Sequence, residues 1–131
     1  MNGTNRFLEE QIMTASPEAR FLMLYDRLLV DLDRARDAIV NKQIEAAHNA
    51  LIHGQEIVQV LRNSMRTDIW PGGEDVKQLY GYAFLELVKA NTTKSLEPLE
   101  RAEIVLRPLG EAWHQAAEKA MMARGAFSGV A

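Results

Sequence analysis

Apolar residues recur at alternating spacings of three and four along four successive stretches of this 131-residue chain. Such spacing places the apolar side chains on one face of an α-helix, because about 3.6 residues complete each turn. The stretches span about 17–40, 42–66, 74–91 and 96–122. No segment alternates apolar and polar residues for long enough to favour a β-strand. The sequence therefore predicts an all-α fold.

Local signals mark the ends of these predicted helices. Ser16 is suited to cap the first helix, and Pro17 fits its first turn, where a missing N–H leaves no bond unmade. The segment 70–73 (Trp-Pro-Gly-Gly) separates the second helix from the third. Pro108 lies inside the fourth helix and predicts a kink there. Because the other two connections are short, we expect an antiparallel up-down-up-down four-helix bundle.

The two ends of the chain lie outside the periodic region. We expect residues 1–16 to form a flexible N-terminal arm and residues 123–131 a loose C-terminal tail. The bundle itself then spans 17–122, a length that suits a single domain.

Charge and composition exclude several classes of function. The formal net charge of −3, without a basic cluster, argues against nucleic acid as a partner. No apolar run approaches the roughly 20 residues that cross a bilayer, so membrane insertion is not expected. The chain has no cysteine, which removes disulfides, thiolate metal sites and a cysteine nucleophile from consideration.

Three histidines are the main candidates for chemistry, and none is strongly supported. Glu45–His48 and Glu111–His114 repeat a Glu-x-x-His motif that di-metal helical bundles use. The two histidines would lie roughly 20 Å apart along parallel helices, so we expect no metal site and no cofactor. A reactive His53 or His114 would instead define a histidine phosphotransfer or sensory bundle. We expect no enzymatic activity.

The third helix carries more apolar surface than a bundle core requires. Tyr82, Leu85 and Val88 fall at positions that would normally face water, and Ile57 and Val60 lie beside the seam of the second helix. These five residues are predicted to form a docking surface for an apolar partner. The alternative is a surface for weak self-association in a plain helical dimerisation scaffold.

Several short motifs resemble one known family. They are Thr14-Ala15-Ser16-Pro17-Glu18, Leu22-Met23-Leu24-Tyr25-Asp26, Gly72-Gly73-Glu74, Leu79-Tyr80-Gly81-Tyr82, Ala90-Asn91 and Glu111-Ala112-Trp113. In this order and spacing they resemble the flagellar secretion chaperones of the FliS family.

The resemblance implies a cytoplasmic helical bundle that binds the disordered C-terminal segment of flagellin. Such a chaperone prevents premature polymerisation and assists delivery to the flagellar type III export apparatus, including components of the export gate. The family also has an N-terminal arm that covers the client groove, usually with a tyrosine where this chain has Phe7. From the residue pattern, we predict that Phe7 and Ile12 occupy the groove when no client is bound.

Overall fold

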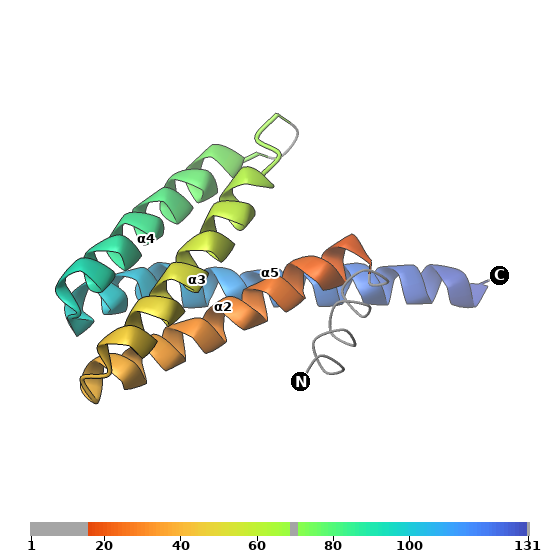
Figure 1. Ribbon diagram of the computed structural model, residues 1–131. Coiled ribbons are helices and arrows are strands. Elements are labelled where there is room, and N and C mark those ends of the chain that lie inside the picture. Colours follow the sequence, from red (N-terminus) through yellow and green to blue (C-terminus); the bar gives the residue numbers. More distant parts are fainter. Residues whose placement is uncertain (1–15, 69–70, 131) are drawn as a thin grey trace.

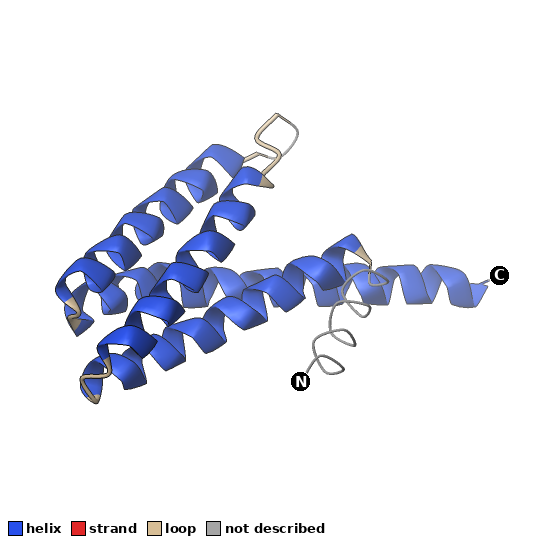
Figure 2. Cartoon of the chain, viewed as in Figure 1, coloured by secondary structure: helices blue, strands red, loops and turns tan. Residues whose placement is uncertain are grey.

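The structure, a computed structural model, describes residues 16–68 and 71–130, with side chains up to residue 123. Four helices account for most of this part of the chain: α2 (Pro17–Val40), α3 (Ile44–Asn63), α4 (Gly73–Thr93) and α5 (Leu96–Val130). The described residues contain no strand (Figure 2). The all-α prediction is therefore confirmed.

The helices begin and end where local chemistry favours it. Ser16 is the N-cap of α2, and its hydroxyl accepts a hydrogen bond from the Ala19 N–H at 3.2 Å. Gly72 adopts a φ of 84° immediately before α4 begins at Gly73. This left-handed backbone conformation favours glycine, which lacks the Cβ that would cause strain there.

Each helix packs against two others in the order α2, α3, α4, α5 and back to α2 (Figure 1). Every consecutive pair runs antiparallel because short connections join the helices end to end. The predicted bundle is thus observed, with α2 beside α5 as its closing contact.

The core consists of the predicted helical seams. Large side chains with no more than 1% exposure include Tyr25, Leu28, Leu51, Tyr80 and Leu106, which come from all four helices. Alanines fill the narrower positions between them, among them Ala35, Ala83, Ala90 and Ala102. Close packing of this kind supplies most of the apolar burial that stabilises a small domain.

The main departures from prediction lie at the ends of the seams. Ile44 is 59% exposed at the beginning of α3, and Ala116 and Ala120 are exposed on α5. The last two lie on the part of α5 that extends past the beginning of α2 (Figure 1). Its backbone is helical as far as Val130, so residues 123–130, which the sequence places in a loose tail, continue α5.

Candidate functional site

An apolar cavity of about 480 Å³ lies at the end of the bundle where α2 begins. Its walls come from the first turns of α2, from residues 64–66 directly after α3, and from the second half of α5. The main apolar lining residues are Pro17, Phe21, Leu22, Met65, Trp113, Ala116, Ala117 and Ala120. A volume of this size accommodates several apolar side chains of a bound polypeptide.

The cavity has a rigid floor. The Phe21 and Trp113 rings meet edge to face, with centroids 5.6 Å apart. Trp113 Nε1 donates a hydrogen bond to the Tyr80 hydroxyl at 2.8 Å, and the Tyr25 hydroxyl donates one to the Leu106 carbonyl at 2.6 Å. Burial raises the pKa of both tyrosines above the usual value for a phenol. They therefore stay neutral and act as packing and hydrogen-bonding groups.

A second hollow, about 410 Å³, lies on the outer side of the α3–α4 contact. Its lining consists of Ile52, Gln55, Glu56 and Gln59 from α3 and Phe84 from α4. Val88 follows Phe84 by one helical turn and so lies on the same side of α4. We call the hollow together with Val88 the α3–α4 groove.

The structure places the predicted docking residues in different environments. Tyr82 is 43% exposed, Leu85 59% and Val60 51%, as the sequence predicts, whereas Val88 is half-buried. Ile57 was predicted to be available to a partner, and this is wrong, because it is only 4% exposed. It is buried, together with Ala50, beside the predicted seam residues Gly54 and Leu61 of α3.

The remaining docking residues do not share one groove. At about 100° per residue, Leu85 points away from the core, Val88 turns toward α3, and Tyr82 turns toward α5. Glu86, one helical turn after Tyr82, contacts Arg101 of α5 at 2.8 Å, which is consistent with this direction. None of the predicted set is among the residues that line the hollow, and Val88 lies one helical turn beyond its Phe84. Phe7 and Ile12 lie outside the described residues.

Sequence reasoning missed Ile52 as a groove residue and did not distinguish Phe84 from its neighbours. Phe84 stands off the seam of α4, which is a visible signal, but Ile52 adjoins a seam residue and looks like part of the core. Which off-seam residues meet depends on how α3 and α4 are rotated against each other. That rotation is a tertiary property.

The three histidines each contact a polar side chain of another helix. His53 Nδ1 hydrogen-bonds to Asp31, which is 3% exposed, and His114 Nε2 lies 2.8 Å from Asp26 Oδ1. His48 Nδ1 lies 3.1 Å from Asn91 Nδ2. These contacts bridge α2 to α3, α2 to α5 and α3 to α4, so each histidine has a structural role between helices. Within the described residues, no three acidic or histidine side chains are grouped to hold a metal ion.

No helix in the described part of the chain combines the length and apolar character needed to cross a bilayer.

A polypeptide-binding protein is the class that best fits a helical bundle with solvent-accessible apolar hollows. A family model described as "Flagellar protein FliS" matches residues 1–120. The chain belongs to the FliS family of flagellar proteins.

Two relatives carry the name flagellar secretion chaperone FliS. The protein of Bacillus subtilis is 28% identical over 130 residues, covering 99% of this chain and 97% of its own. The protein of Salmonella typhimurium is 30% identical over 118 residues, covering 86% of this chain and 85% of its own. The family predicted from the short motifs is therefore confirmed.

Proposed function

We propose that this protein is a cytoplasmic export chaperone for flagellin. It binds the disordered C-terminal segment of the client, prevents premature polymerisation and assists delivery to the flagellar type III export apparatus. The observation that carries the proposal is membership of a family whose two relatives are named flagellar secretion chaperones. Those names describe a binding role and support a protein without catalytic activity.

The open apolar hollows support this proposal physically. A disordered segment loses conformational entropy when it docks, and burial of apolar side chains in preformed hollows offsets that loss. The cavity beside Phe21 and Trp113 and the groove beside Phe84 offer two such places on one molecule. Leu85 and Tyr82 extend the apolar surface of α4 outward and would add further contacts.

We further propose that the N-terminal arm covers client-binding surface in the free protein, with Phe7 and Ile12 as its apolar contacts. The arm joins α2 at Ser16, and the neighbouring Pro17 lines the apolar cavity. The cavity is therefore within immediate reach of the arm. Removal of residues 1–12 is expected to raise client affinity, because the client then displaces nothing. Unchanged affinity after this deletion would contradict the covering role.

Calorimetric titration tests the main proposal directly. The titrant is a peptide of about 50 residues from the C-terminus of flagellin of the same organism, and the control is flagellin without that segment. We expect 1:1 binding of the peptide with a large negative heat-capacity change, as for coupled folding and binding. The truncated flagellin is expected not to bind. Absence of peptide binding at tens of micromolar contradicts the proposal.

Substitution of exposed apolar residues then locates the surface. Leu85→Asp places a charge on the outward face of α4 and is expected to weaken peptide binding about tenfold or more. Val30→Asp, at a 41% exposed position on α2, is the matched control and should leave affinity unchanged. Ile57→Asp is unsuitable as a probe, because a charge at this buried position would unfold the bundle. Full affinity in folded Leu85→Asp would place the client elsewhere.

A further inference from the structure

The α3–α4 groove ends in a positively charged group that has no partner. Among the described side chains, Nε of Arg62 is the buried nitrogen or oxygen atom without a hydrogen bond. Its guanidinium lies against Gly81, since a Cβ built there would sit 3.8–3.9 Å from the Arg62 Cζ, Nε and Nη2 atoms. The guanidinium of Arg62 makes no ion pair with the described residues. A buried donor left in this state is unfavourable, because it has lost water and gained no acceptor.

Five other arginines of the described bundle are paired, and the two that make no ion pair with the described residues, Arg20 and Arg34, are exposed to solvent. Arg27 contacts Asp31, Arg36 and Arg107 share Glu103, Arg66 contacts Asp68, and Arg101 contacts Glu86. The fold thus supplies carboxylates to these arginines but not to Arg62, although Arg62 carries the buried donor. This difference points to an acceptor from outside the described bundle.

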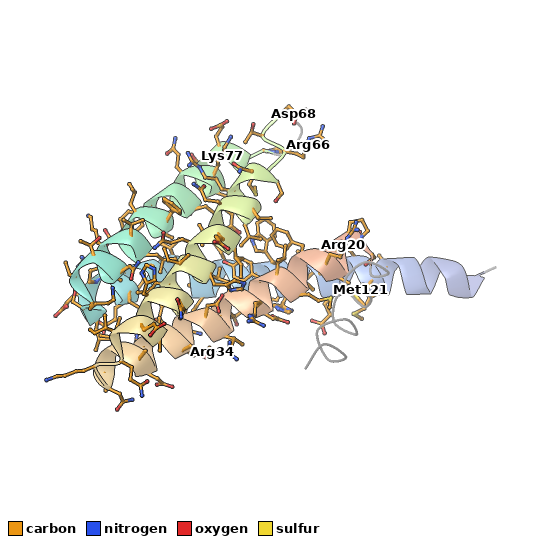
Figure 3. The ribbon with its side chains drawn as sticks, in the orientation of Figure 1. Arg20, Arg34, Arg66, Asp68, Lys77 and Met121 are labelled. Atoms are coloured by element: carbon orange, nitrogen blue, oxygen red, sulfur yellow. The ribbon has the colours of Figure 1, made fainter. Side chains whose placement is uncertain are left out.

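The beginning of α4, near Arg62, carries one further cation together with the acidic residues Glu74 and Asp75. Lys77 lies one helical turn before Gly81 on α4 and makes no ion pair among the described residues. Figure 3 shows Lys77 at the loop end of the α3–α4 pair, with Arg66 and Asp68 in the neighbouring loop. Asp68 is held by Arg66, and Glu56 is the carboxylate among the residues that line the hollow. A negative group of a ligand would be attracted chiefly by the guanidinium of Arg62 itself.

Apolar surface follows directly from the charged end. Along α4, Phe84 lies about 5 Å and Val88 about 10 Å from Gly81, at a rise of about 1.5 Å per residue. Ile52 of α3 lines the same hollow as Phe84, and Gln55 and Gln59 add hydrogen-bonding groups to its lining. The groove therefore presents a cation first and an apolar floor one to two helical turns away.

We propose that Arg62 is the polar anchor of this groove and binds a carboxylate of the exported client. This inference rests on the proposed function and adds the chemistry of the recognised segment. The segment is amphipathic, with apolar side chains against Ile52, Phe84 and Val88. An Asp or Glu of the same segment lies about two helical turns away, on the guanidinium. Arginine suits this role because its planar group offers several donors to one carboxylate.

The test compares wild-type protein, Arg62→Gln and the control Arg34→Gln in titrations with the C-terminal flagellin peptide. Arg62→Gln is expected to weaken binding about tenfold to a hundredfold, because it removes a charge-assisted hydrogen bond. Arg34→Gln should leave affinity unchanged, since Arg34 is exposed on α2 and lines neither the apolar cavity nor the α3–α4 groove. The melting temperature of Arg62→Gln should not fall, because no contact with a described hydrogen-bond acceptor is lost.

A double-mutant cycle identifies the acceptor. Each Asp and Glu of the peptide is changed to Asn or Gln and titrated against both proteins. Replacement of one particular carboxylate should weaken binding to the wild-type protein but should not change binding to Arg62→Gln. Absence of any such coupled carboxylate would overturn the proposal.

The outcomes separate this inference from the proposed function. Peptide binding by wild type with unchanged affinity in Arg62→Gln overturns the anchor and leaves the chaperone function standing. Higher affinity in Arg62→Gln also overturns it, because Arg62 would then hold a competing acceptor, such as Glu9 or Glu10 of the N-terminal arm. No peptide binding by wild type contradicts the proposed function itself.

Discussion

The outer sides of the α2–α5 and α3–α4 contacts differ in how their charges are satisfied. Between α2 and α5, Glu103 accepts hydrogen bonds from Arg36 and Arg107, and Arg107 also contacts Asp33 at 2.7 Å. Between α3 and α4, the Arg62 Nε is buried without an acceptor beside an apolar hollow. The charges of the first contact are satisfied within the chain, although its end opens into the apolar cavity, whereas the second combines an apolar hollow with an unused donor. A binding protein needs both kinds, because a closed contact holds the scaffold while an open one receives the partner.

The close approach of α2 and α5 predicts the largest change in stability. A Cβ at Gly110 would lie 2.5 Å from Cε1 of Tyr25, which is fully buried. Gly110→Ala should therefore lower the free energy of unfolding by about 3 kcal/mol, because a rigid ring must move within the core. Urea denaturation measures this change.

Gly54→Ala is the matched control for that substitution. Its Cβ would meet Leu28, Asp31 and Leu87 at 3.6–3.9 Å, which is ordinary contact. Because alanine favours the helix, Gly54→Ala should raise the free energy of unfolding by up to about 1 kcal/mol. Equal effects at the two glycines would show that the α2–α5 contact is no tighter than the rest of the bundle.

The charge cluster predicts the next largest effect. Glu103 is 9% exposed and serves two arginines, so Glu103→Gln should lower the free energy of unfolding by about 2 kcal/mol. Glu100 is the control, because its contact with Arg36 is longer, at 3.6 Å, and its side chain is 53% exposed. Glu100→Gln should change stability by less than about 0.5 kcal/mol. Similar losses of stability in both variants would show that the buried position of Glu103 does not strengthen its ion pairs.

The α4–α5 contact gives a smaller, pH-dependent effect. Burial raises the pKa of Glu86, but hydrogen bonds from Arg101 and Lys89 and their charges outweigh it, so the pKa lies below its ordinary value. The unfolded chain then binds more protons near pH 4 than the folded chain. The resulting stability is present above the unfolded pKa and is lost as the pH falls through the folded pKa.

Urea denaturation between pH 7 and pH 3 measures this loss. Glu86→Gln should lower stability at pH 7 and flatten its decline with acid. Glu111→Gln removes an exposed carboxylate of α5 and should follow the wild-type curve. If the stability of Glu86→Gln declined with acid as steeply as that of the wild type, the decline would have to come from other carboxylates.

The contrast between contacts also explains how much of the molecule could be predicted from its sequence. Four helices, their order and most of the core follow from apolar spacing alone, because one face of each helix must be buried. The groove does not follow, since Ile52 and Phe84 meet only through the rotation of α3 against α4. Ile57 was misassigned for the same reason.

Ion pairs across the bundle were equally beyond reach of the sequence. Asp33 and Arg107 are far apart along the chain and are brought together by the closing contact of α2 with α5. The sequence also could not show that Arg62 lacks an acceptor. An arginine without a partner is recognised only when the residues around it in the fold are known.

The smallest predicted effect has the opposite sign and lies in the open groove. Arg62→Met keeps a long stem over Gly81 but removes the unsatisfied buried donor, so stability should rise by up to about 1 kcal/mol. Arg66→Met alters an exposed pair with Asp68 and should change stability by less than about 0.5 kcal/mol. Urea denaturation of both variants decides the point. A loss above about 1 kcal/mol in Arg62→Met would show that the guanidinium holds α3 to α4, and the two contacts would then be alike. A gain would mean that the free bundle carries Arg62 at a cost in stability, as expected of a residue whose acceptor arrives with a partner.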